Sequence, residues 1–381
     1  MSDELPHFAR TLRRQLVRAA AEQPQRRFDR LRFGVGRGVL VAAVALILAA
    51  AIGIPLAQLS GLRGGGSEAG VSSVVPGASE TVFPVATFNL KTSTFSVEPG
   101  ISGVAAGFGS VWVVGQQSIF RLDAGNGDVL ATIPFDGGDY GSVTLGEKSV
   151  WATNGGPDVT EVDPQTNKVL TTVTVGGHVH SLVADSGALW VSTSEKGGEL
   201  VQVDPDSGSV TGTVAAPVGW LQYVDGTVWV LGGETATEVD AQSLSASTVQ
   251  LPVSGPSVVD AGYIWSVSQN TADADESEVA KVSVDTGEVV SKVTVPRAAA
   301  IAADSTGVWV LSATGSKSDD IYLPDPKKPA LVTLIDPTSG VQAADPVPVD
   351  ITPASIGVGE GDLWVSHYEA GMVTRIEPTA A

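Results

Sequence analysis

Seven tryptophans, each directly preceded by an apolar residue, recur along this chain at a spacing close to 40 residues. Their successive intervals are 39, 39, 39, 36, 44 and 55 residues. A fixed period of this length is typical of repeat architectures, and roughly 40 residues is the size of one propeller blade. The register therefore predicts a ring of seven similar units. Its tryptophans are Trp112, Trp151, Trp190, Trp229, Trp265, Trp309 and Trp364, and Trp220 lies outside it.

The third unit, residues 180–216, shows how one repeat predicts one blade. Strand-like runs at 181–184, 188–192, 199–203 and 209–214 are separated by Gly, Asp and Pro turn residues. Four short strands in succession predict a four-stranded antiparallel meander. The second run is apolar on both faces, as a strand between two packed sheets must be. We therefore expect each tryptophan of the register to wedge between adjacent blades.

The last unit is incomplete, because only three residues follow Pro378. A strand-like piece at residues 90–98, ahead of the first unit, aligns with the outer strands of the other units. It is predicted to complete blade seven and close the ring, which removes open sheet edges. The expected fold is all-β: a seven-bladed β-propeller of four-stranded antiparallel blades over residues 85–381, preceded by a cytoplasmic helix and one transmembrane helix.

Residues 39–59 form a 21-residue stretch without charge. A helix of that length spans about 30 Å, the thickness of the bilayer core. Nine arginines precede it, so the positive-inside rule places residues 1–38 in the cytoplasm and the propeller outside. A cleaved signal peptide is the alternative, but the apolar run is longer than is usual for one, and no clean A-x-A site follows. The chain is thus predicted to be a single-pass protein of the cell membrane.

The segments on either side of this span have different roles. Residues 1–38 predict a basic amphipathic arm with a stripe of Phe8, Leu12 and Leu16. The arm either lies on anionic lipid, making lipids a partner of residues 1–59, or sets the topology without a partner. Residues 60–84 are rich in Gly, Ser and Pro and predict a flexible linker.

Charge and cysteine content exclude several classes of function. Residues 1–37 hold nine arginines against four acids, whereas residues 64–381 hold 12 Lys and Arg against 38 Asp and Glu, a net charge of −26. So acidic a domain is a poor partner for nucleic acid, whose phosphates need Lys and Arg. The absence of cysteine excludes disulfides, thiolate metal sites and thiol nucleophiles.

An aspartate-led turn recurs between the third and fourth runs, for example at Asp163, Asp204 and Asp336. These aspartates form a regular array that could be taken for metal ligands. Asp and Pro followed by Gly is, however, the composition of a tight turn in which the carboxylate accepts backbone hydrogen bonds. We expect these residues to cap turns at the rim of the blades.

The repeats have the form V-A-x-x-x-G-x-V/L-W-V…V-D-P-x-T/S-G-x-V over about residues 90–378. This pattern resembles the seven-bladed propellers of the YVTN-repeat and streptogramin-lyase-like superfamily. The resemblance implies the fold, in a superfamily of lyases, lactonase-like enzymes and many binding proteins. The lyases carry a repeated Trp-Phe-Thr-Glu, a general-base His and a Mg²⁺-binding acid. Only residues 363–369 come near that pattern here, so the resemblance implies lyase chemistry weakly.

The loops that enter each inner strand and leave each second strand share one face of a propeller, around its central channel. The two long intervals place extra residues, about 269–278 and 313–330, on this face, and such insertions often mark a binding face. Aromatic and titratable groups at a concave mouth indicate a binding site. The predicted ligand-binding residues are Tyr140, His178, His180, Trp220, Arg297, His367, Tyr368 and Glu369.

Two functions are compatible with these residues. The first is a non-catalytic binding or sensory module for a small molecule, peptide or cell-wall component, with no cofactor and no metal. The second is a Mg²⁺-dependent lyase or lactonase that acts through His367 or His180 with Glu369. No Ser-His-Asp order, metal-ligand spacing or phosphate loop favours an enzyme, and His178 and His180 could simply be surface residues. The sequence specifies neither the ligand nor the oligomeric state.

Overall fold

A computed structural model describes residues 88–380 apart from 137–140, 186, 233, 251–254, 270–275, 313–314, 319–320, 325–328 and 351. The chain divides into two units, Met1–Phe83 and Pro84–Ala381. The predicted arm, span and linker lie outside the described residues. Within the described part of the second unit, no helix is long and apolar enough to cross a membrane.

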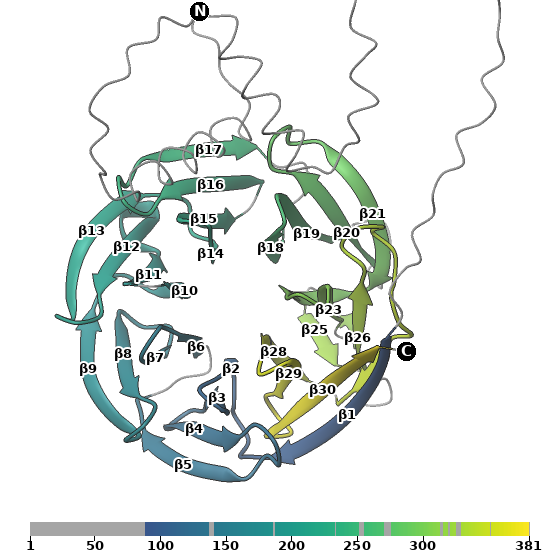
Figure 1. Ribbon diagram of the computed structural model, residues 1–381, viewed down its shortest axis with the longest axis horizontal. Helices are drawn as coiled ribbons and strands as arrows, with labels where there is room; N and C mark the ends of the chain where they lie inside the picture. Colours follow the sequence, from purple (N-terminus) through teal and green to yellow (C-terminus); the bar gives the residue numbers. More distant parts are fainter. Residues whose placement is uncertain are drawn as a thin grey trace, which may run out of the picture. The chain divides into compact units, whose positions relative to one another are not determined.

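Seven four-stranded antiparallel sheets surround a central axis, which is the β-propeller expected from the repeats (Figure 1). Each sheet has an inner, a second, a third and an outer strand. The inner strands are β2 (Val104–Gly107), β6 (Ser142–Leu145), β10 (Val179–Asp185), β14 (Trp220–Val224), β18 (Ser257–Asp260), β22 (Ala298–Ala303) and β28 (Pro353–Gly359). The second strands are β3 (Ser110–Val114), β7 (Val150–Thr153), β11 (Ala188–Thr193), β15 (Thr227–Gly232), β19 (Tyr263–Gln269), β23 (Val308–Ser312) and β29 (Asp362–His367).

In each blade the outer strand is more exposed than the third strand. The third strands are β4 (Ser118–Asp123), β8 (Asp158–Asp163), β12 (Glu199–Asp204), β16 (Thr235–Asp240), β20 (Glu276–Ser283), β26 (Ala330–Ile335) and β30 (Met372–Ala380). The outer strands are β5 (Val129–Pro134), β9 (Lys168–Thr174), β13 (Ser209–Ala215), β17 (Ala246–Gln250), β21 (Val289–Pro296), β27 (Val347–Val349) and β1 (Phe88–Ser96).

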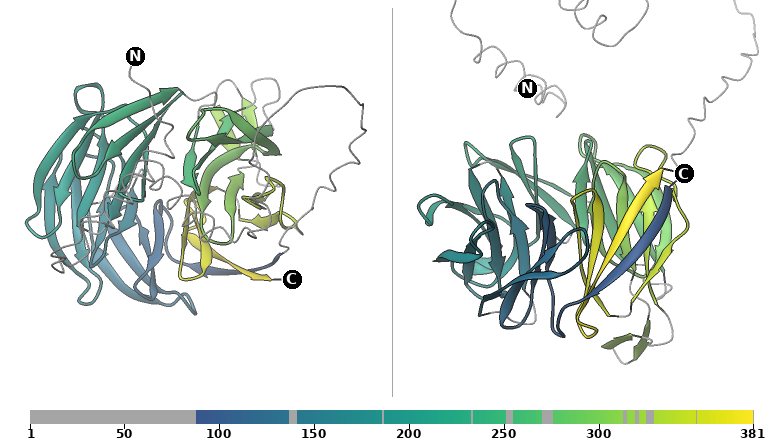
Figure 2. Two further views of the ribbon diagram at one scale, coloured as in Figure 1. Left: turned by 45° about the horizontal axis from the view of Figure 1, so that its top comes forward. Right: turned by 60° about the horizontal axis from the view of Figure 1, so that its bottom comes forward.

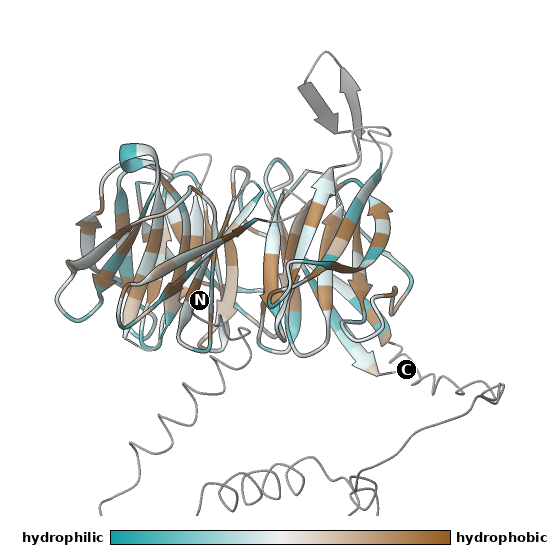
Figure 3. Cartoon of the chain, turned by 90° about the horizontal axis from the view of Figure 1, so that it is seen from above, coloured by the Kyte–Doolittle hydropathy of each residue, from teal (hydrophilic) through white to brown (hydrophobic). Residues whose placement is uncertain are grey.

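The connections between strands lie on two faces of the propeller (Figure 3). We call the upper face the one that carries the loops into the inner strands and the loops from second to third strands. The lower face carries the other turns, together with the two ends of the described chain, Phe88 of β1 and Ala380 of β30. Blade six has an extra hairpin, β24 (Gly315–Ser318) paired with β25 (Ile321–Pro324), in its upper-face loop (Figure 2).

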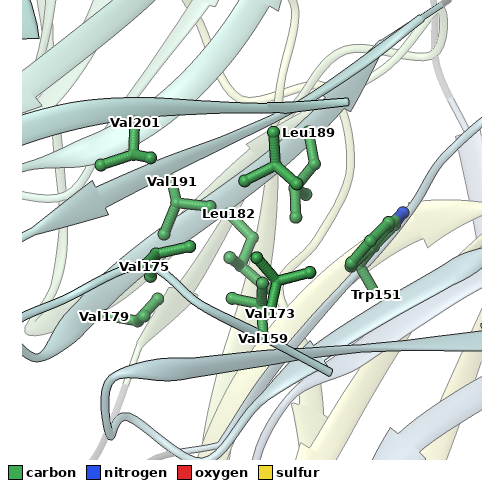
Figure 4. Packing of buried hydrophobic residues seen from close by; sticks show 10 residues of the cluster. Trp151, Val159, Val173, Val175, Val179, Leu182, Leu189, Val191 and Val201 are labelled. Atoms are coloured by element: carbon green, nitrogen blue, oxygen red, sulfur yellow. The ribbon is translucent and has the colours of Figure 1, made fainter. Parts of the chain in front are cut away.

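One tryptophan fills each boundary between blades. The buried apolar residues form seven clusters, and each joins the register tryptophan of one blade to side chains of the next. In the cluster of blades two and three, Trp151 packs with Val159 and Val173 of its own blade and with Leu182 and Leu189 of the following one (Figure 4). The seven register tryptophans are at most 4% exposed. The expected wedge between blades is therefore confirmed.

A cationic side chain on the third strand covers the tryptophan in three blades. Arg121, Lys281 and Arg375 lie directly opposite Trp112, Trp265 and Trp364 in strand register, with the charged group 5.2–5.7 Å from the indole centroid. Each also donates a hydrogen bond to a backbone carbonyl in the third-to-outer turn of the next blade. The acceptors are the carbonyls of Pro164, Pro337 and Gly125, at 2.5, 2.6 and 3.3 Å.

The first strand of the propeller completes its last blade. β1 pairs antiparallel with β30 from Phe88↔Ala380 to Ser96↔Met372, so a strand from before blade one is the outer strand of blade seven. Phe95 of β1 lies 6.3 Å from the Trp364 ring and packs against the turn between the third and outer strands of blade one, where Gly127 has a φ of 76°. A Cβ at Gly127 would collide with the Phe95 ring. This contact links the closing strand to the next blade.

Replacing a register tryptophan should cost far more stability than replacing the one outside the register. Trp190→Ala removes a fully buried indole and should lower the free energy of unfolding by about 3–5 kcal/mol. Trp220→Ala, at a side chain 38% exposed, should lower it by only about 1 kcal/mol. Urea denaturation followed by circular dichroism measures both. Equal losses of unfolding free energy in the two variants would contradict the packing of Trp190 between blades.

Substitution of Gly127 tests the ring closure. Gly127→Ala adds overpacking against Phe95, of about 1–3 kcal/mol, to the cost of a left-handed conformation for alanine, about 1–2 kcal/mol. Gly226→Ala is the matched control, because Gly226 has a φ of 83° and a Cβ added there would meet no atom within 4 Å. The control should therefore show only the conformational cost in the same denaturation experiment. Equal destabilisation by the two changes would mean that the Phe95 contact does not hold the ring closed.

Candidate functional site

An exposed aromatic pair lies on the upper face where blades three and four meet. His180, at the start of β10, and Trp220, the first residue of β14, stack edge to face with ring centroids 5.3 Å apart. Side chains alternate along a strand, so Leu221 turns into the core and is 7% exposed, whereas Trp220 remains 38% exposed. Of the eight tryptophans, all in the described residues, Trp220 alone presents its ring to solvent.

Two serines, the half-buried Ser181 and the buried Ser192, hold the start of the inner strand of blade four in place. The backbone N–H of Leu221 donates to the Ser181 hydroxyl at 3.0 Å, and that of Gly219 donates to the Ser192 hydroxyl at 3.2 Å. Both bonds cross from blade three to blade four, so they fix the start of β14 against β10 and β11. The rings of His180 and Trp220 are therefore positioned by backbone contacts beneath them.

Partial burial of its ring lowers the pKa of His180 below its ordinary value. Desolvation penalises the charged imidazolium, so the ring is neutral at neutral pH. Because the unfolded chain binds this proton more readily, the folded state loses stability as the pH falls below the ordinary pKa of histidine, about 6.5. A neutral imidazole against an indole adds no positive charge to this part of the face.

His178 precedes His180 by two residues but does not stack with the His180–Trp220 pair. Its Nδ1 lies 3.2 Å from the Gly155 carbonyl of blade two, and its backbone N–H donates to the Ser194 hydroxyl at 3.1 Å. Ser194 begins the loop that contains a 3₁₀ turn at Glu195–Gly197. A Cβ added at Gly177 would touch Glu195, and one added at Gly198 would touch the backbone at residues 216–218, before Trp220. This loop therefore packs between the segments that lead into β10 and β14.

The other predicted residues lie elsewhere on the ring. His367 ends β29 in blade seven, is fully buried, and lies 2.9 Å from the Thr374 hydroxyl through Nε2, so its ring does not line the upper face. Tyr368 follows it, half-buried, and accepts from Gln116 of blade one at 3.2 Å. Glu369 is exposed on the same loop, and Arg297 is half-buried before β22. Tyr140 lies outside the described residues.

The predicted set thus splits into two groups that the ring keeps apart. His178, His180 and Trp220 gather on blades three and four, whereas His367, Tyr368 and Glu369 belong to blade seven. The pairing of a histidine with Glu369 that lyase chemistry requires is not seen: His180 is on a distant blade and the His367 ring is buried. In the described part of the chain, no three His, Asp or Glu side chains are placed to hold a metal.

The turn aspartates cap their turns, as expected. Asp163 accepts from the backbone N–H of Gln165 at 2.7 Å and from the Thr166 hydroxyl at 2.7 Å. Asp204 and Asp336 make the equivalent bonds. The Thr166 hydroxyl and the N–H of Gln165 hold the pKa of Asp163 below its usual value. These carboxylates are engaged on the lower face, away from the exposed pair.

A groove that runs from the upper edge between blades one and two down the outer strand of blade two was not predicted from the sequence. It has a volume of about 230 Å³ and lies where the outer strand of blade one leads into blade two. Its chemistry is mixed, with an aromatic ring, two carboxylates and paired threonine hydroxyls. The lining residues are Pro134, Phe135, Asp136, Asn154, Asp158, Thr160, Val169 and Thr172. The connection Phe135–Asp136 carries no motif, so only its place between two strands could have indicated the site.

Comparison with known proteins identifies the fold. No family model matches the chain, and no curated protein matches its sequence. The solved structure of BamB from Moraxella catarrhalis is similar, with a TM-score of 0.53 and 11% identity over 76% of this chain and 100% of that one. Kuenenia stuttgartiensis hydrazine synthase gives a TM-score of 0.49 and 14% identity over 59% of this chain and 72% of that one.

The class of protein follows from the topology and from the likeness to BamB. Both describe a β-propeller, and the seven sheets specify a seven-bladed one. At 11% identity the likeness to BamB supports the fold and nothing beyond it. Any function must therefore be argued from the surface of this chain.

Removing the Trp220 ring should raise the pKa of His180. Trp220→Ala exposes the imidazole to water, so the charged form is no longer penalised. An NMR titration of the His180 ring signals in the two chains measures the shift. Phe108→Ala, which removes an aromatic 39% exposed in a lower-face turn, should leave the His180 titration unchanged. If the pKa of His180 is the same in Trp220→Ala as in the unchanged chain, a group other than Trp220 causes the desolvation.

Proposed function

We propose that this chain is a membrane-tethered extracytoplasmic β-propeller that binds a ligand or partner protein on its upper face and has no chemistry of its own. The exposed His180–Trp220 pair is the observation that carries the proposal. Aromatic side chains with one ring face exposed are enriched at recognition surfaces. The interblade hydrogen bonds beneath the pair keep it in one geometry, which favours binding because less order is lost.

The distribution of exposed apolar side chains supports the choice of face. Among the residues that the structure describes, the large exposed apolar side chains besides Trp220 are Phe108 and residues at or near the start of outer strands, which is the lower edge. They are Val129, Leu130, Val169, Leu170, Val210, Val289, Val290 and Val341. These are scattered singly or in pairs over separate blades, as on ordinary surfaces. Trp220 differs because it stacks with His180 beside polar loops of the upper face.

The tether is proposed from the sequence. The uncharged stretch 39–59 and the nine arginines before it favour a span with the propeller outside the cytoplasm. The described chain begins at Phe88 on the lower face, opposite the upper loops. We further propose, from the repeat pattern, a place in the YVTN-repeat and streptogramin-lyase-like superfamily, among its binding members.

Single cysteines can test topology and occupancy together, because the chain has none of its own. With a membrane-impermeant maleimide on intact cells, Lys196→Cys on the upper face and Asp206→Cys on the lower face should be labelled, whereas Ser2→Cys should not. Lys196→Cys should react several-fold more slowly in cells than in the purified full-length chain, because the ligand covers it. Asp206→Cys should react equally in both.

Two results would overturn the proposal. Labelling of Ser2→Cys in intact cells, with the propeller cysteines unlabelled, would reverse the topology. Equal reaction rates in cells and in the purified chain for Lys196→Cys would show that nothing occupies this part of the upper face.

A further inference from the structure

A series of contacts joins the groove to the exposed pair across three blades. Asn154 of blade two donates from Nδ2 to the Asp136 carbonyl at 2.7 Å, beside the groove. The two residues after Asn154 contact blade three through their carbonyls. The Gly155 carbonyl lies 3.2 Å from His178 Nδ1, and the Gly156 carbonyl accepts from the Val179 N–H at 3.0 Å. The surface therefore continues from the groove, past His178, to His180 and Trp220. We call it the blade 2–4 track.

The blade 2–4 track has an exposed or groove-lining aromatic residue at each end and carboxylates along its length. Phe135 lines the groove at one end, and Trp220 is exposed at the other. Asp136 and Asp158 line the groove, and Glu195 lies in the loop between β11 and β12. The cation in the described loops of this track is Lys196, which pairs with Glu199 at 3.1 Å. The local charge is thus negative.

The charge of the rest of the propeller has the same sign. Residues 64–381 carry a net charge of −26, from 12 Lys and Arg against 38 Asp and Glu. Such a field draws in cationic partners and repels phosphates and acidic glycans. Trp is the best aromatic partner for a Lys or Arg side chain, and the neutral ring of His180 beside it adds no opposing charge.

From this geometry we infer that the blade 2–4 track receives an extended, positively charged polypeptide segment, with a Lys or Arg side chain against Trp220 and others near Asp136 and Glu195. An extended segment suits the track because its aromatic and acidic groups are spread over three blades. The inference rests on the proposed function, since it specifies the ligand of the same face.

Fluorescence anisotropy of a labelled peptide tests this chemistry on the purified full-length chain. The probe is a peptide of alternating Gly and Lys, about 12 residues long, and the comparison is the matching Gly–Glu peptide. The Gly–Lys peptide should bind and the Gly–Glu peptide should not. Trp220→Ala and Asp136→Asn should each weaken binding, Trp220→Ala by about tenfold as for an anchor residue. Raising the salt from about 0.05 M to about 0.5 M should weaken it by a similar factor or more.

The matched control is Asp206→Asn, which removes the same charge from an exposed lower-face turn and should leave the affinity unchanged. A loss in Asp206→Asn equal to that in Asp136→Asn would mean diffuse attraction to an acidic protein and would overturn the inference. So would binding that survives Trp220→Ala undiminished, or equal binding of the Gly–Glu peptide. If Lys196→Cys is protected in cells while the Gly–Lys peptide fails to bind, the proposed function stands and this inference falls.

Discussion

The packing of one indole into each boundary between blades is the interaction on which the rest of this structure depends. A four-stranded blade of this sequence is apolar on both faces of its second strand and cannot bury them alone. Each tryptophan joins its blade to the next, and the seven clusters follow one another around the ring. A chain of such contacts leaves two unmatched faces unless it returns to its start. The closing strand β1 therefore completes the last sheet and also allows the last blade to pack against the first.

The residue opposite each tryptophan varies, and the variation follows from what lies beyond the boundary. Arg375 reaches from blade seven to a turn of blade one, Arg121 from blade one to blade two, and Lys281 from blade five to blade six. A charge-assisted bond to a backbone carbonyl is stronger than a neutral one, so these three boundaries between blades gain a link in addition to packing. Glu161 takes the same place in blade two and is buried, which raises the pKa of its carboxyl. Identical blade positions therefore have different energetics.

Periodicity made the blades, the wedge and the capped turns predictable, because each depends on residues close in sequence. The pairing of Trp220 with His180 was predicted only as a shared face, since their approach depends on two serine contacts between blades. His367 shows the limit of periodicity: at the end of its strand it turns inward to Thr374, and strand alternation near a loop did not reveal this. The groove at Phe135–Asp136 arises from how two blades diverge, which no local pattern encodes.

The two faces of the ring are used differently, and this restricts where recognition can occur. On the lower face, aspartates such as Asp163 and Asp204 accept hydrogen bonds within their own turns, and the two ends of the described chain, Phe88 and Ala380, lie there. The upper loops carry the inserted hairpin β24–β25. Trp220 is exposed because the wedge of its blade is already filled by Trp229. A large aromatic that stability does not require, held in place by its neighbours, is what a binding surface needs.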